Sequence, residues 1–261
     1  MFFKIRNHTV FPSVLLALIA ASGVSLLTQH SLGLTPQFPL RVTLLFTFGA
    51  AGVAILAAKH LPPGSFGPAN RVTLARGAMT ALLLAMFAEN ANPVVAWFTV
   101  TVALAALALD GVDGWLARRH GDSSDFGARF DMETDALLIF SIAVLTWQHG
   151  KAGAWILAAA LLRYGFVASS YLLPWLKRPL PNSRRRRVIC VVQILTLIFS
   201  LLPIVPSSLS WAVALSGLVL LSASFAIDIE WLVRAHRAPG QSFLKPVTNP
   251  DALSPSTRPG L

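Results

Sequence analysis

The sequence contains very little cysteine and little charge for its length. Its 261 residues include a single cysteine, Cys190, which lies in an apolar run. A disulfide within the chain is therefore excluded, and none between chains is implied. Only 12% of the residues are charged while 55% are hydrophobic, and a water-soluble core of this size cannot bury so much apolar side chain. The composition predicts an integral membrane protein.

Acidic residues are scarce and unevenly placed. The chain has 11 Asp and Glu residues against 21 Lys and Arg, and seven of the acids fall between Asp110 and Asp135. Carboxylates beside membrane-length apolar runs are unfavourable unless a cation or a substrate offsets their desolvation. The stretch 110–135 is therefore the first candidate for a functional site.

The basic excess, a formal net charge of +10, would suit nucleic-acid binding if it formed one face. The Lys and Arg residues occur instead in short clusters between apolar runs, which is the positive-inside pattern of membrane proteins. We therefore expect membrane lipids, and no nucleic acid, among the partners.

Apolar runs that approach the length of a membrane-spanning helix recur along the chain. We expect an all-α fold with about eight transmembrane helices, near residues 10–27, 42–58, 72–87, 93–109, 136–147, 154–176, 188–202 and 211–227. The first run is interpreted as an anchor rather than a signal peptide, because its small residues lie inside it. Three parts are expected: a two-span hairpin over 1–61, a six-span core over 62–237, and a disordered tail over 238–261, rich in Pro, Ser and Thr.

Eight spans place both termini on one side of the membrane. Most basic clusters fall on that side, whereas the opposite loops hold little beyond Arg41 and Lys151. Because Lys and Arg favour the cytoplasmic side, we expect the acidic stretch and both termini to be cytoplasmic.

The spacing of four aspartates favours a metal site. Asp110 and Asp113 are three residues apart and Asp131 and Asp135 four apart, so each pair shares one face of a helix. Two helices joined by a short connector bring the four carboxylates together. Oxygen ligands without His or Cys select a hard cation, so two Mg²⁺ or Mn²⁺ ions and a phosphate substrate are expected.

Other residues of the stretch fit a phosphate ligand. Gly114 and Ala117 leave room for a bulky ligand beside Asp113, and Gly127 makes room before Asp131. Arg118, one turn after Gly114, can hold a phosphate with its planar guanidinium. The remaining three acids are interpreted as solvated loop acids: Asp122, Asp125 and Glu133.

Several basic residues leave two interpretations open. The run Arg184 to Arg187 can serve topology and anionic lipid, or one member, Arg187, can bind an anionic acceptor. Arg163 lies near the middle of a span, so it either pairs with an acid or phosphate inside the bundle or extends to the interface. For Arg76, a structural and a substrate role are equally open. Arg163 and Arg187 are therefore the candidate acceptor-binding residues.

The spacing resembles the complete motif of the CDP-alcohol phosphatidyltransferase family. Eight identities at fixed spacing over twenty-six positions carry this resemblance: Asp110, Asp113, Gly114, Ala117, Arg118, Gly127, Asp131 and Asp135. Upstream, Asn70, Thr73 and Arg76 resemble the opening of the family's first core helix, although Asn70 and Thr73 can also simply cap a helix start. The resemblance implies a six-helix core, so the first two spans are an addition without an assigned role.

The resemblance implies transfer of a phosphatidyl group from a CDP-linked lipid to an alcohol with release of CMP. It implies that the metal ligands are Asp110, Asp113, Asp131 and Asp135, and that Asp135 is also the base. It implies that the CDP pocket is formed by Gly114, Ala117, Arg118 and Gly127, to which we add Asn70 and Thr73. It also suggests a homodimer. A bacterial cytoplasmic membrane is the expected location.

Three functions compete. The first is transfer from CDP-diacylglycerol to a small polar alcohol in phospholipid biosynthesis, with glycerol 3-phosphate the first acceptor to test because of the basic run. In the second, the alcohol and not the lipid carries the CDP group, and its head group is transferred to diacylglycerol. The third is a transporter or ion pathway, since acids inside membranes also line such routes. The clustering of the acids in one stretch argues against the third.

Overall fold

The fold is entirely helical over the residues described by the computed structural model, 10–61, 66–120, 124–178, 180 and 183–237, where no strand occurs. The expected disordered tail, 238–261, lies outside them. The α-helices are α1 Val10–Leu32, α2 Phe38–His60, α3 Pro68–Met86, α4 Pro93–His120, α5 Asp125–Gln148, α6 Ala158–Leu172, α7 Arg184–Leu201 and α8 Ser207–Arg237. The prediction of an all-α membrane protein is confirmed.

Each expected span corresponds to a helix, but most helices extend beyond the apolar run. Five segments are long and apolar enough to cross a membrane: Val10–Leu32, Phe38–Lys59, Pro93–Leu116, Ala154–Leu172 and Ser207–Arg237. The other three helices, α3, α5 and α7, carry polar side chains on their buried faces, such as Asn70, Thr134 and Gln193. Their lower hydropathy thus reflects polar groups inside the bundle.

The sixth expected span, 154–176, is divided rather than continuous. A short 3-10 helix, η1 (Ala154–Leu157), precedes α6, and a second, η2 (Pro174–Lys177), follows it. Pro174 cannot donate a backbone hydrogen bond to the preceding turn, so α6 ends just before it.

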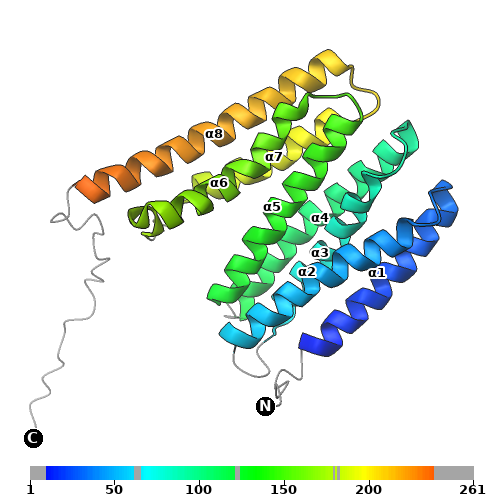
Figure 1. Cartoon of the computed structure of the whole chain (residues 1–261), viewed down its shortest axis with the longest axis horizontal. Coiled ribbons are helices and arrows are strands. Elements are labelled where there is room, and N and C mark those ends of the chain that lie inside the picture. Colours follow the sequence, from blue (N-terminus) through cyan, green and yellow to red (C-terminus); the bar gives the residue numbers. More distant parts are fainter. Residues whose placement is uncertain (1–9, 62–65, 121–123, 179, 181–182, 238–261) are drawn as a thin grey trace, which may run out of the picture.

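Successive helices alternate in direction along the bundle (Figure 1). As a result, the start of α1, the end of α4, the start of α5 and the end of α8 lie on the same side of the molecule. We call this side the acidic end, because α4 and α5 carry the aspartates of 110–135 there. The placement agrees with the even number of crossings expected from the sequence.

The N-terminal hairpin, α1 and α2, packs beside α3 (Figure 1). A small hydrophobic cluster joins it to the core, in which Phe46 and Ala50 of α2 meet Leu74 and Ala81 of α3 and Phe126 of α5. The main hydrophobic core lies further from the acidic end and includes Leu83, Ile142 and Leu197. The division into a hairpin and a six-span core stays a prediction.

At the end opposite the acidic end, a buried carboxylate ties the hairpin to the core. Glu89, 6% exposed, follows α3 and accepts hydrogen bonds from the Thr35 backbone N–H at 3.0 Å and the Thr35 hydroxyl at 2.6 Å. Arg41 of α2 pairs with the same carboxylate at 3.0 Å, and Gln148 donates to the Glu89 carbonyl at 2.6 Å. We call these four residues the Glu89 cluster.

Candidate functional site

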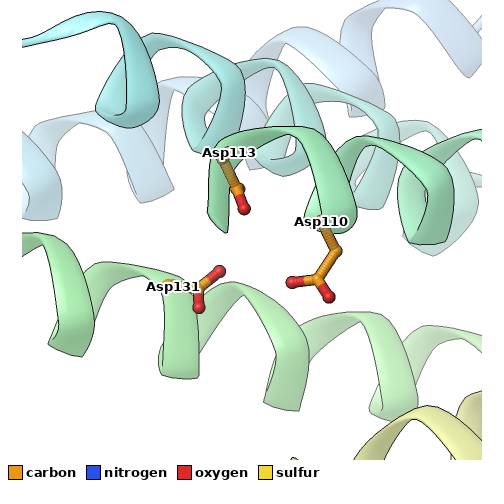
Figure 2. A group of neighbouring side chains, drawn as sticks. All are labelled: Asp110, Asp113 and Asp131. Atoms are coloured by element: carbon orange, nitrogen blue, oxygen red, sulfur yellow. The ribbon is translucent and has the colours of Figure 1, made fainter. Parts of the chain in front are cut away.

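Four aspartates from two helices converge at the acidic end. Figure 2 shows Asp110 and Asp113 pointing from α4 toward Asp131 on α5. Each offers one carboxylate oxygen, and these oxygens lie within 4.8 Å of one another, an arrangement that can hold a metal ion. Asp135, one turn further along α5, joins them through a shared partner. We call the four the acidic cluster. The spacing in the sequence therefore predicted their convergence correctly.

The shared partner of the acidic cluster is Arg76 of α3, whose side chain is fully buried at 0% exposure. Its Nη1 lies 2.8 Å from Asp113 Oδ2 and 2.6 Å from Asp131 Oδ1. Its Nη2 lies 3.0 Å from Asp110 Oδ1 and also donates to Asp135. One guanidinium thus links all four carboxylates, and the site comprises α3 as well as α4 and α5.

The charges of this arrangement do not balance. Four carboxylates and one guanidinium leave a formal charge of −3. Excess negative charge on carboxylates that are only partly exposed is unfavourable unless cations approach it. The donors are all carboxylate oxygens, the ligand type preferred by hard divalent ions. The acidic cluster therefore fits the divalent metal that the resemblance implies.

Asp135 lies one turn further along α5 than Asp131 and contacts α7 as well as α3. Its Oδ2 lies 3.8 Å from the thiol sulfur of Cys190 on α7. One of its oxygens therefore faces Arg76 and the other faces α7. The group of carboxylate oxygens within 4.8 Å of one another comprises Asp110, Asp113 and Asp131. Asp135 lies next to this group and is not a member of it.

The start of α3 approaches the acidic cluster through polar side chains. Thr73, 3% exposed, has its hydroxyl 3.1 Å from both Asp113 Oδ2 and the Ala69 carbonyl oxygen. Asn70 is also buried, and a Cβ added to Gly127 would lie 3.0 Å from Asn70 Oδ1. Gly127 therefore allows close contact between α5 and α3, a use of this glycine that the sequence interpretation did not include.

The remaining motif residues lie along α4. Gly114 is partly exposed beside Asp113. Ala117 and Arg118 belong to the last turns of α4, and their side chains fall outside the described part of the structure. Their expected contribution to a CDP pocket stays a prediction.

The basic run at the start of α7 separates into residues with different environments. Arg185 donates to the carbonyl and hydroxyl oxygens of Ser224, at 2.8 Å and 2.9 Å, and pairs with Asp228 at 2.5 Å. Arg185 is thereby fixed to α8. Arg187 is exposed and close enough to Asp110 to interact with it electrostatically. Of these two arginines, Arg187 is the one whose charge acts on Asp110 of the acidic cluster.

The interpretation of loop acids is wrong for Glu133 and for Asp125, because both lie within α5. Glu133, interpreted as a solvated loop acid, lies within α5 and forms an ion pair with Arg163 of α6. The sequence interpretation failed because α5 begins at Asp125, well before its apolar part. Asp125 is exposed in the first turn of α5, and Asp122 lies outside the described residues.

Sequence reasoning underestimated Arg76. Its position near the start of a span was compatible with an interfacial role, so a structural role and a substrate role stayed open. The available signal was its spacing, since Thr73 and Arg76 are three residues apart and share one face of α3. That face meets the acidic cluster.

Comparison with known proteins agrees with this geometry. A family model described as CDP-alcohol phosphatidyltransferase matches residues 66–223, which is more than half of the chain and includes all four aspartates and Arg76. No curated protein and no solved structure gives a significant match.

Proposed function

Because the chain belongs to the CDP-alcohol phosphatidyltransferase family, we propose that it transfers a phosphatidyl group from CDP-diacylglycerol to a small polar alcohol and releases CMP. The observation that supports this reaction is the acidic cluster, in which four carboxylates surround one buried guanidinium. Transferases of this family act on phosphate groups in phospholipid biosynthesis, and the apolar helices of the chain suit a lipid substrate.

In this proposal Asp110, Asp113, Asp131 and Asp135 hold two divalent cations, Mg²⁺ or Mn²⁺. When bound, such ions neutralise phosphate oxygens and stabilise the charge that develops on the entering and leaving oxygens. Arg76 keeps the four carboxylates directed toward one another, because both of its terminal nitrogens are shared between α4 and α5. Arg76 is thus a positioning residue.

The CDP group is proposed to lie against α4 and the start of α3. Gly114 and Ala117 leave space beside Asp113, and Arg118 supplies a cation for a phosphate. Asn70 and Thr73 complete this side of the pocket, and Gly127 lets their helix approach α5. The Thr73 hydroxyl also fixes the orientation of the Asp113 carboxylate.

Asp135 is the proposed base. The hydroxyl oxygen of the acceptor forms a bond to the phosphatidyl phosphorus, and its proton passes to the Asp135 carboxylate. The bond between that phosphorus and the bridging oxygen breaks, and CMP leaves with the bonding electron pair. The Asp135 oxygen that faces α7 is the one proposed to accept the proton, because Arg76 binds the other.

The acceptor is proposed to be anionic, and glycerol 3-phosphate is the first candidate. The exposed guanidinium of Arg187 lies near Asp110 and can bind a phosphate at the edge of the acidic cluster. Arg163 is the second candidate, although Glu133 already pairs with it. In the membrane, the acidic end is proposed to face the cytoplasm of a bacterial cell, where CDP-linked donors occur, and the protein is proposed to be a homodimer.

A donor and acceptor panel tests this assignment. The purified chain is supplied with CDP-diacylglycerol plus glycerol 3-phosphate, serine, inositol phosphate or choline, and separately with CDP-linked alcohols plus diacylglycerol, all with Mg²⁺ or Mn²⁺. We expect CMP release with CDP-diacylglycerol, fastest with a phosphorylated acceptor. CMP release only from CDP-linked alcohols would reverse the assignment of donor and acceptor. Metal-independent solute flux without CMP release would favour a transporter.

A further inference from the structure

An apolar cavity of about 480 Å³ lies between the N-terminal hairpin and the core. Three helices line it: α2 between Leu45 and Leu56, α3 between Leu74 and Leu84, and α5 between Phe126 and Leu137. The wall contributed by α2 belongs to the part of the chain that precedes the family match at 66–223. The cavity is therefore a product of the additional hairpin.

Glycines widen this cavity. Gly49 and Gly52 of α2 and Gly77 of α3 line it, and a Cβ built on any of the three would meet no atom within 4 Å. Larger side chains can therefore be introduced at these positions to fill the cavity without an immediate clash.

The length of the cavity along α2 and α5 is close to the thickness of one leaflet of a bilayer. Its lining spans twelve positions of α2, Leu45 to Leu56, and twelve of α5, Phe126 to Leu137, a rise of about 16 Å along each helix. The hydrocarbon core of a bilayer is about 30 Å thick, so the length of the cavity is roughly half of that thickness. An apolar space of this length is suited to an alkyl chain rather than to water.

The end of the cavity nearest the acidic end is polar. Ser124, Asp125, Arg129 and Glu133 line it there. Glu133 is already paired with Arg163, and none of the ion pairs found among the described residues includes Arg129, whose side chain is exposed. Arg129 is thus an exposed cation at the polar end of an otherwise apolar space, where it can bind the phosphate of a lipid.

The cavity and the acidic cluster lie on different faces of the same helices. On α5, Phe130 and Thr134 face the cavity, whereas Asp131 and Asp135 face Arg76. On α3, Gly77 faces the cavity, whereas Arg76 faces the acidic cluster. A molecule in the cavity is therefore separated from the reacting phosphates by α3 and α5.

We propose that the cavity binds one alkyl chain of a phospholipid from the surrounding bilayer, with the phosphate of that lipid at Arg129. This lipid is not a reactant, because its phosphate lies on the far side of α3 and α5 from the acidic cluster. It fills the space between α2 and the core, which assigns a role to the N-terminal hairpin. Binding of this lipid does not require the transfer reaction, but its description as a non-reactant rests on the proposed placement of the donor phosphates at the acidic cluster.

Native mass spectrometry of the full chain tests the proposal, after reconstitution in bilayer discs of palmitoyl-oleoyl phosphatidylglycerol and release into detergent. We expect one retained phosphatidylglycerol per chain in the unaltered protein and its loss in Gly49→Leu and Gly77→Leu. Gly23→Leu is the matched control, because Gly23 lies on α1, lines no part of the cavity and has the same open surroundings. Arg129→Gln should reduce the retained phosphatidylglycerol.

Two results at the glycines would overturn the proposal. One is retention of the lipid in both folded glycine variants at the level of Gly23→Leu, which would identify it as lipid bound elsewhere. The other is a change of oligomeric state in Gly49→Leu alone, which would indicate that a second copy of the chain fills the cavity. Circular dichroism and size-exclusion profiles report whether each variant is folded.

An excess of CDP-diacylglycerol distinguishes the two possible sources of an alkyl chain. We expect the phosphatidylglycerol to stay bound when this donor is added, since the donor phosphates belong to the acidic cluster. Displacement of the phosphatidylglycerol by CDP-diacylglycerol would contradict the proposal and assign the cavity to the donor's own chain.

Discussion

Arginine side chains pair with carboxylates at both ends of this bundle, but in different proportions. In the Glu89 cluster, one carboxylate is matched by Arg41 and by two hydrogen bonds from Thr35. In the acidic cluster, one guanidinium, Arg76, is shared by four carboxylates. The first arrangement is balanced in charge, and the second keeps a formal charge of −3.

The difference separates a structural ion pair from a ligand site. A balanced buried pair is satisfied within the protein, and it fixes the hairpin to the core. An unbalanced cluster destabilises the folded chain by itself, and the cations and phosphates of the proposed reaction would offset that destabilisation. Four predictions test this distinction, beginning with the largest expected effect.

Asp135→Asn should abolish transfer while leaving most of the CDP-lipid binding. The amide cannot accept the proton of the acceptor hydroxyl, and loss of a general base lowers kcat by about 10² to 10⁴. CMP release and binding of CDP-diacylglycerol are measured on purified protein. Glu230→Gln is the control, because Glu230 forms only an exposed pair with Arg234. Turnover retained in Asp135→Asn would remove Asp135 from the mechanism.

Arg76→Gln should destabilise the protein by about 3 to 5 kcal/mol, because four carboxylates then lack their common cation. Mg²⁺ or Mn²⁺ should raise the unfolding temperature of this variant more than that of the unaltered protein. Arg76→Lys keeps the charge but not the planar fork, so it should recover part of the stability and little activity. If the metal raised the unfolding temperature equally in Arg76→Gln and in the unaltered protein, the guanidinium and the cations would not both neutralise the same carboxylates.

Glu89→Ala should lower stability by about 2 kcal/mol, because Arg41 and the donors of Thr35 lose their acceptor. Transfer per folded chain should stay unchanged, and divalent ions should not restore the lost stability. Thermal unfolding in detergent, with and without Mg²⁺, measures both properties. Restoration of stability by Mg²⁺ would contradict the distinction between a structural ion pair and a ligand site.

Arg187→Gln should raise the KM for an anionic acceptor about tenfold, equivalent to roughly 1.4 kcal/mol for one lost ionic contact. Arg163→Gln should have the smaller effect, because Glu133 already binds its guanidinium. Its exposed ion pair contributes at most about 1 kcal/mol to stability. KM values are compared at saturating donor, and a larger change in Arg163→Gln would transfer the acceptor site to α6.

The arrangement of the acidic cluster was predictable because it depends on local spacing. Intervals of three and four residues place Asp110 with Asp113, and Asp131 with Asp135, on one face of a helix each. The short connector makes these two helices neighbours, so the four carboxylates meet. Membrane insertion was equally predictable, since it depends on composition and on the lengths of apolar runs.

What sequence reasoning could not provide depends on contacts between distant segments. The pairing of Arg76 with α4 and α5 requires the packing of three helices, and the Glu89 cluster joins two loops, α2 and the end of α5. Glu133 was misplaced for a related reason, because hydropathy reports where a helix becomes apolar and not where it begins. Pairing with Arg163 likewise depends on the position of α6.

The central claim is that the excess negative charge of the acidic cluster serves metal-dependent transfer. The most direct test measures CMP release from CDP-diacylglycerol and an acceptor by chelator-treated protein, before and after addition of Mg²⁺ or Mn²⁺, in the unaltered chain and in Asp113→Asn. We expect release only after metal addition, and none in Asp113→Asn. Release at the full rate without divalent ions, or undiminished release by Asp113→Asn, would contradict the claim.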